Sequence, residues 1–309
     1  MVGRKQVLNN LLKNTFEIIA DPITKNSLRL DNSKTENEHV ISGNLVEQSE
    51  KKYNIEFGIA DLLPKKEDMV IEKSKFDVWE KVQENGLLTY EKFPEFNCSI
   101  EGRNETELFK DFCSFSGIVL DVGSGPSIPG YFLNNQKIDL AIGLDPLIPH
   151  KEIELKSNID LIRGIGEFMP FNNNIFDLVC FATSFDHVIY PELVLKEVQR
   201  VLKPEGQAVF WIEEDRQDKK SLISRGINKT KRTILPKLSK KVKSRNAKIK
   251  KLQETVTNLE IPKGAEDHFH IKHFKYNEFT RLCSTLNFEY VEEEKLDNNQ
   301  GVFLRYNFK

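Results

Sequence analysis

Val119-Leu-Asp-Val-Gly-Ser-Gly-Pro126 is the segment from which the architecture of this 309-residue chain can be inferred. Apolar, β-favouring residues run directly into two glycines, Gly123 and Gly125, that are separated by one residue. This pattern is typical of a buried parallel strand that opens into a loop where the backbone approaches a ligand closely. The third glycine of the dinucleotide-binding fingerprint does not follow, so the loop alone does not identify the ligand.

A second apolar segment, Asp139 to Asp145, ends in an acid at the expected distance of about 20 residues from the loop. A carboxylate at the carboxyl end of the second strand of a doubly wound sheet can accept hydrogen bonds from both ribose hydroxyls. The alternative is a turn or cap residue before Pro146. The spacing favours the ribose-binding interpretation.

Further strand and helix patterns continue the alternation along the chain. Phe176 to Ala182 predicts another buried strand, Pro191 to Leu202 an amphipathic helix, and Gln207 to Ile212 a fifth strand. Near the end, Tyr276 to Leu286 predicts a helix, and 288–296 and 301–308 a closing antiparallel pair.

The stretch from about Gly117 to Ile212 resembles the class I S-adenosylmethionine-dependent methyltransferases of the type 11 group. Four motifs carry the resemblance: Asp121-Val-Gly-Ser-Gly-Pro126, Gly143-Leu-Asp-Pro146, Gly164-Ile-Gly-Glu-Phe-Met-Pro-Phe171 and Arg200-Val-Leu-Lys-Pro-Glu-Gly206. The resemblance implies an α/β fold, with a Rossmann-like, doubly wound, seven-stranded and mostly parallel sheet. It also implies S-adenosylmethionine as cofactor, but it does not identify the acceptor, because one fold supports many functions.

The resemblance also implies a set of cofactor-binding residues. The glycine loop matches the segment that wraps the amino acid moiety, Asp145 matches the ribose-binding acid, and Gly166 with Glu167 matches the region that borders the adenine. Many relatives carry an acid two residues before this glutamate, where the present chain has Ile165. The complete predicted set is Asp121, Gly123, Ser124, Gly125, Asp145, Gly166, Glu167 and Thr183.

Asp186 and His187 follow the fourth strand, at the sheet edge where such folds bind ligands. They are the predicted catalytic residues, acting as base and orienter for an acceptor hydroxyl. The alternative is that Asp186 caps the next helix and His187 packs beneath the cofactor. Methyl transfer by in-line displacement can also proceed by positioning alone.

Three histidines, His268, His270 and His273, lie within the segment Asp267 to Phe274. The segment resembles a His-x-x-His-Phe run that lies on the acceptor side in many type 11 methyltransferases, so these histidines are the predicted substrate-binding residues. Packing and metal binding are the alternatives. No acidic residue lies at the spacing from these histidines that a known metal site requires, and we therefore predict no metal.

The N-terminal segment resembles a small zinc-ribbon module. This chain has Asp21-Pro-Ile-Thr24 where the module carries Cys-Pro-x-Cys, and all four of its cysteines lie elsewhere, at 98, 113, 180 and 283. Tetrahedral zinc requires four nitrogen or sulfur ligands. We therefore predict a metal-free, degenerate zinc-ribbon-like accessory domain over 1–64, with a plain β-hairpin decoration as the alternative.

Residues 65–115 predict a helical linker or lid, and 116–309 the methyltransferase domain. Five aromatic residues of the linker are predicted to cover the cofactor cleft or the acceptor site, with core packing as the alternative: Phe76, Trp79, Tyr90, Phe93 and Phe96.

A basic helical insertion is predicted over 216–262. Between Arg216 and Lys251 there are 15 lysines and arginines and one acid, Asp218, although the whole chain carries a net charge of −2. Such a stretch suits an anionic membrane surface, a phosphorylated acceptor or RNA, and a solvated helix is the alternative. Aromatic residues are absent from it, which disfavours single-stranded RNA.

The sequence contains no apolar run of 18 residues and no secretory signal, and its scattered cysteines suit a reducing compartment. We therefore predict a cytoplasmic enzyme, with peripheral membrane contact as an option. The favoured acceptor is a sugar or another small polar molecule, including a surface-glycan or lipid-linked intermediate. An RNA methyltransferase and a catalytically inactive scaffold are the alternatives, and the oligomeric state is not determined.

Overall fold

The computed structural model describes residues 11–36, 39–93, 104–126, 132, 135–147, 160–212, 250–296 and 301–308. Most of the predicted basic insertion, together with Phe96 and Cys98, lies outside these residues. None of the helices in the described ranges is long and apolar enough to cross a bilayer.

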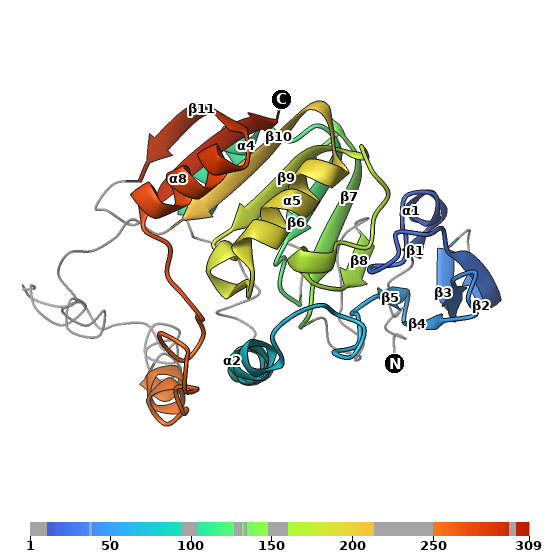
Figure 1. Ribbon diagram of the computed structural model, residues 1–309, viewed down its shortest axis with the longest axis horizontal. Coiled ribbons are helices and arrows are strands. Elements are labelled where there is room, and N and C mark those ends of the chain that lie inside the picture. The colour runs from blue at the N-terminus through green and yellow to red at the C-terminus, as the bar shows by residue number, and fades with distance from the viewer. Residues whose placement is uncertain are drawn as a thin grey trace, which may run out of the picture.

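Seven strands form the central part of one twisted sheet, as the sequence predicted (Figure 1). Their order across the sheet is β8-β7-β6-β9-β10-β12-β11. The first five run parallel, and β12 pairs antiparallel with both β10 and β11. The strands are β6 (Gly117–Val122), β7 (Ile138–Asp145), β8 (Asp160–Arg163), β9 (Phe176–Ala182), β10 (Leu202–Ile212), β11 (Phe288–Lys295) and β12 (Val302–Phe308).

Helices cover both faces of this sheet because neighbouring strand residues point to opposite sides. On one face, Leu120 and Phe181 belong to the core that α5 (Pro191–Val201) and α8 (Tyr276–Thr285) close. On the other face, Val119 and Cys180 pack with residues of α4 (Asn104–Cys113). The sheet is therefore buried on both sides, as a parallel sheet must be.

The N-terminal strands continue the same sheet beyond β8. The strand of this region that lies next to β8 is β5 (Ile59–Asp61), which pairs with it in parallel. Asp61 also forms an ion pair of 2.7 Å with Arg163. The other elements are β1 (Leu11–Leu12), α1 (Lys13–Phe16), β2 (Arg29–Glu36), β3 (His39–Val46) and β4 (Lys52–Glu56). The accessory region is thus joined to the methyltransferase-like part by backbone hydrogen bonds.

Asp21 organises the turn at 21–24, where the predicted resemblance to a zinc ribbon would place a cysteine pair. Its Oδ1 accepts backbone hydrogen bonds of 2.8 Å from Ile23 and Thr24, and its Oδ2 accepts a 2.6 Å bond from the Tyr53 hydroxyl. Burial opposes ionisation, but these hydrogen bonds outweigh it and lower the pKa of Asp21. A buried carboxylate therefore orders the turn in this chain.

A second carboxylate orders the opposite turn, where the second cysteine pair of a ribbon is expected. Glu47 accepts a hydrogen bond of 2.6 Å from the Ser49 amide and one of 2.7 Å from Asn26 Nδ2. Because Asn26 follows the first turn, its amide joins the two turns directly. The described residues of this region offer a hydrogen-bonded network instead of a zinc site.

Removal of the Asp21 carboxylate is expected to destabilise this region selectively. Asp21→Ala leaves two part-buried backbone donors and the buried Tyr53 hydroxyl without their acceptor, which is expected to lower the free energy of unfolding by about 3 kcal/mol. Asp21→Asn retains an oxygen acceptor for the two backbone donors and is expected to cost less than half as much. Urea denaturation of both variants checks this, and equal losses would contradict it.

Candidate functional site

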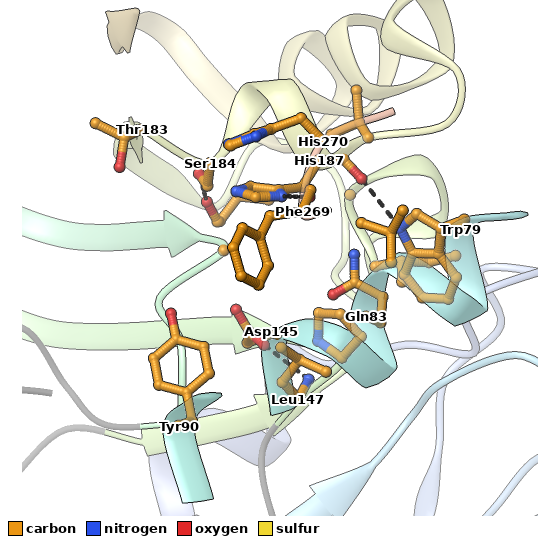
Figure 2. A pocket seen from close by; sticks show the side chains of 18 of the residues that line it. Trp79, Gln83, Tyr90, Asp145, Leu147, Thr183, Ser184, His187, Phe269 and His270 are labelled. Carbon is orange, nitrogen blue, oxygen red and sulfur yellow. Dashed lines mark hydrogen bonds between the residues drawn. The ribbon is translucent and has the colours of Figure 1, made fainter. Parts of the chain in front are cut away.

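A cavity of about 390 Å³ lies at the carboxyl ends of the central strands. Residues after β6, β7, β8 and β9 form one side of it, and α2 (Lys73–Lys92) closes the other (Figures 1 and 2). The helical residues Leu252 and Val256 also reach the cavity. Its volume lies in the range of about 300–1,000 Å³ typical of pockets for small molecules and cofactors.

The glycine loop lies at the floor of the cavity in a conformation that requires glycine. Gly123 and Gly125 have φ angles of +79° and +73°. A Cβ atom at Gly123 would also collide with Ser184, whose hydroxyl donates to the carbonyl oxygen of Val122. The loop can therefore bring its backbone close to a ligand, as the sequence pattern indicated.

Asp145 ends β7 at the cavity wall and ties two loops together. Its Oδ2 accepts a hydrogen bond of 2.8 Å from the Gly125 amide, and its Oδ1 accepts one of 2.7 Å from the Leu147 amide. Burial raises the pKa of Asp145 to about 6, although both hydrogen bonds oppose the rise. Each carboxylate oxygen retains acceptor capacity toward the cavity, which suits a pair of ligand hydroxyls.

Glu167 lies in the short helix η2 (Gly166–Phe168), where it also stabilises the backbone. Its Oε1 accepts hydrogen bonds of 2.6 Å and 3.1 Å from the amides of Ile189 and Tyr190. Burial raises the pKa of this carboxyl. Glu167 thus fixes the start of α5 while it lines the cavity.

His187 ends the short helix η3 (Phe185–His187) and lines the cavity. Its Nδ1 lies 2.7 Å from the carbonyl oxygen of Phe269, so this nitrogen carries the proton. Burial, followed by the neighbouring His270, lowers the pKa of His187 to about 4. The ring is therefore neutral near pH 7, with an unprotonated Nε2.

Asp186 does not orient His187, as the predicted pair would require. Its Oδ2 lies 3.5 Å from Nδ1 of His273, and its Oδ1 is buried with no hydrogen-bond partner among the described residues. The carbonyl oxygen of Phe269 orients His187 instead. Sequence spacing does not reveal this arrangement, because Phe269 and His273 come from a turn more than 80 residues away.

Asp267 shapes that turn and holds two of the three predicted histidines. Its Oδ1 accepts hydrogen bonds from the amides of Phe269 and His270, at 2.8 Å and 2.9 Å. The carboxylate also contacts Nδ1 of His270 and Nε2 of His273, each at 2.9 Å. Hydrogen bonds with Asp186 and Asp267 raise the pKa of His273 to about 10.

Helix α2 lies along the cavity and carries two of the aromatic residues that were predicted to cover it. The indole Nε1 of Trp79 donates a 3.0 Å hydrogen bond to the carbonyl oxygen of His187, and both Trp79 and Tyr90 line the cavity (Figure 2). Phe76 and Phe93 are buried in the core. Gln83 also lines the cavity, and its place on the helix face of Trp79 and Tyr90 is the signal that could have identified it.

The structure brings only part of the predicted site together on the cavity surface. The lining includes Gly123, Asp145, Gly166, Glu167, Thr183, His187 and His270. The remaining predicted residues, which the lining does not include, are Asp121, Ser124, Gly125, Asp186, His268 and His273. Among these, Gly125 contacts Asp145 through its amide, and Asp121 is fully buried beside Cys180.

Comparison with known proteins identifies the central segment. Residues 120–210 match the protein family described as methyltransferase domain. The chain is 28% identical over 141 residues to the demethylmenaquinone methyltransferase of Staphylococcus carnosus, which covers 45% of this chain and 58% of that protein. It is 32% identical over 110 residues to the uncharacterized protein MJ1252 of Methanocaldococcus jannaschii, over 35% of this chain and 41% of that protein. The chain therefore spans about half the length of the curated relatives it matches.

Two solved structures that align with this chain come from one archaeal and one bacterial protein. The PH0226 protein from Pyrococcus horikoshii aligns with a TM-score of 0.47 and 20% identity, over 71% of this chain and 98% of that chain. A SAM-dependent methyltransferase from Thermotoga maritima, described as a possible histamine N-methyltransferase, aligns with a TM-score of 0.42 and 18% identity, over 77% and 96%.

Residues 120–210 thus match a methyltransferase domain, in agreement with the predicted class, whose methyl donor is S-adenosylmethionine. The cavity fits this cofactor in two respects. Its floor is a turn in which Gly123 has a positive φ and no side chain lies between the backbone and the cavity, and its wall carries a carboxylate at the end of β7. Gly123 and Asp145 would hold the amino acid and ribose moieties, respectively.

Cofactor affinity is expected to depend on the protonation of Asp145. Above about pH 6 the carboxylate is ionised and accepts hydrogen bonds from ribose hydroxyls. Below that pH it binds a proton that must be released on cofactor binding, so the affinity is expected to fall by up to tenfold per pH unit. Calorimetric titration with S-adenosylhomocysteine from pH 5 to 8 measures this.

The matched control is Asp145→Asn, which has no ionisable carboxyl. Its affinity is expected to be weaker at pH 8 and independent of pH over the same range. Circular dichroism at each pH confirms that both proteins are folded. A wild-type affinity that stays constant down to pH 5 would contradict the assignment.

Proposed function

We propose that this chain is an S-adenosylmethionine-dependent methyltransferase that methylates a hydroxyl group of a small acceptor, with His187 as general base. One observation carries the proposal. The cavity that contains Gly123 and Asp145 also contains a histidine whose Nε2 is held unprotonated by a hydrogen bond on the opposite side of the ring. A neutral imidazole in this tautomer can accept a proton from a substrate.

The arrangement supports an in-line displacement. S-adenosylmethionine supplies a methyl group on a sulfonium sulfur, which keeps the electron pair of the carbon–sulfur bond when the methyl group leaves. His187 Nε2 takes the proton of the acceptor hydroxyl as the acceptor oxygen forms its bond to the methyl carbon. Trp79 and Phe269 hold the backbone and the ring of His187 in place during this transfer.

The cavity lining indicates an acceptor with both polar and apolar parts. Val82, Leu252 and Val256 present apolar side chains, whereas Gln83 and Tyr90 present hydrogen-bonding groups. A sugar attached to a lipid or another apolar carrier combines these properties. This supports the lipid-linked or surface-glycan acceptor that the sequence favoured.

A second candidate acceptor is a quinone. Several curated relatives are demethylmenaquinone methyltransferases or ubiquinone/menaquinone biosynthesis C-methyltransferases, and the apolar lining also suits a quinone ring. In that case His187 would remove a proton from the ring system, and the new bond would be formed to carbon. Incubation with methyl-deuterated S-adenosylmethionine and either cell-envelope glycolipids or demethylmenaquinone separates the two, because mass spectrometry locates the label.

Replacement of His187 is expected to impair turnover and not cofactor binding. His187→Asn places an amide where Nδ1 stood and retains the hydrogen bond to Phe269, but it lacks a basic Nε2. We expect kcat to fall by about 10²- to 10⁴-fold, the usual contribution of a general base, with cofactor affinity within about threefold of the wild type. Steady-state kinetics and calorimetry measure the two effects.

The control variant is His187→Gln, which places an amide nitrogen near the position of Nε2 and is equally non-basic. A loss of activity in both variants supports the role of His187 as base. Wild-type kcat in His187→Asn would show that positioning alone is sufficient. Absence of S-adenosylhomocysteine binding by the folded wild-type protein would contradict the proposed function as a whole.

A further inference from the structure

Asp186 lies close to His270 and His273 beside the cavity, although more than 80 residues separate it from the two histidines in the sequence. One ligand-type atom from each of them lies within 4.8 Å of the others. His270 lines the cavity, and the rings of His270 and His273 lie 4.3 Å apart. The sequence did not suggest this group as a unit, because the carboxylate comes from the short helix η3 and the histidines come from the turn before α8.

The carboxylate of Asp186 lacks the hydrogen bonds that its burial requires. Its side chain is only 7% exposed, its Oδ1 has no partner in the described part of the chain, and its Oδ2 has only the 3.5 Å contact with His273. A buried polar oxygen without a partner is costly unless a donor or a cation satisfies it. The unpartnered oxygen is therefore an independent sign of a missing ligand.

Asp267 orients both histidines in the way that an outer carboxylate orients metal-binding imidazoles. It accepts from Nδ1 of His270 and from Nε2 of His273. The remaining ring nitrogens are Nε2 of His270 and Nδ1 of His273, and the latter must release the proton that it shares with Asp186 before it can bind a metal ion. Metal-ligating histidines usually donate their second ring nitrogen to a carboxylate in this manner.

We propose that Asp186, His270 and His273 bind one divalent first-row transition-metal ion, such as Zn²⁺, at the acceptor side of the cavity. Two imidazoles and one carboxylate form a ligand set that suits these ions and leaves coordination positions open. The candidate ligand atoms lie within 4.8 Å of one another, and metal–ligand distances of about 2.0–2.2 Å require the three side chains to move closer together when the ion binds. The charges of Asp186 and Asp267 balance that of the ion.

The role of the ion, but not its binding, rests on the proposed function. Because His270 lines the cavity, an ion bound there would be able to hold an acceptor oxygen and make its proton easier to remove. His187, whose ring stacks on that of His270 at 4.6 Å, lies beside this position and takes the proton. The ion therefore selects acceptors with an exposed oxygen.

The test measures metal binding directly, without cofactor or acceptor. Protein purified without a polyhistidine tag is treated with a chelator, dialysed, and titrated at pH 8 with Co²⁺, while its visible absorption is recorded. We expect one Co²⁺ per chain with absorption bands of a nitrogen- and oxygen-ligated ion, and displacement by one equivalent of Zn²⁺. Failure of the folded wild-type protein to bind stoichiometric Co²⁺ would overturn the proposal.

Variants assign the ligands. His270→Ala and Asp186→Asn are expected to weaken Co²⁺ binding by more than about 100-fold, and Asp267→Asn by about 10- to 100-fold, the usual effect of an outer-shell change. His268→Ala is the matched control, because His268 lies in the same turn but outside the group of three; we expect its affinity within threefold of the wild type. Wild-type affinity in His270→Ala and Asp186→Asn would overturn the site.

Asp186→Asn preserves the size of the side chain, so a loss of Co²⁺ binding in this variant is not caused by a cavity in the core. Circular dichroism shows whether each variant is folded. S-adenosylhomocysteine affinity is measured on the same samples. Cofactor binding without Co²⁺ binding would overturn the metal site and leave the proposed function intact. Co²⁺ binding without cofactor binding would do the reverse.

Discussion

The hydrogen bonds of the Asp145 carboxylate are the constraint on which the cavity depends. One oxygen accepts from the Gly125 amide after β6, and the other accepts from the Leu147 amide after β7. Two neighbouring strand ends are thereby fixed at a separation that leaves a cavity between them and α2. Because the carboxyl ends of parallel strands meet at one edge, a single buried acid can position both loops and face the ligand.

In the N-terminal region, two carboxylates order turns through hydrogen bonds with the backbone. Asp21 and Glu47 accept hydrogen bonds from the backbone at two turns of this region. Tyr53 and Asn26 connect these carboxylates to the neighbouring strands. The strands then extend the central sheet through the pairing of β5 with β8. The region is therefore continuous with the domain beside it, and its position next to β8 is fixed.

The acceptor side is assembled from segments that contact each other only in the folded chain. The turn at Asp267 holds His270 and His273, and the carbonyl oxygen of Phe269 sets the tautomer of His187. Trp79 on α2 contacts the backbone of His187 from the opposite side. A neutral base, a poorly satisfied carboxylate and two oriented histidines thus lie within one small volume, next to the cofactor-binding loops.

The sequence by itself determined the strands, the glycine turn and the acid after β7, because each depends on local pattern: apolar runs, backbone freedom at glycine, and fixed spacing within one βαβ unit. It also determined that the N-terminal region lacks cysteine ligands. Only the tertiary structure decided that Asp186 faces His273 and not its neighbour His187, that Glu167 stabilises the start of α5, and that Trp79 contacts the backbone of His187. These relations join residues up to about a hundred positions apart, and no local pattern encodes which of several polar side chains will meet when the sheet and its loops pack together.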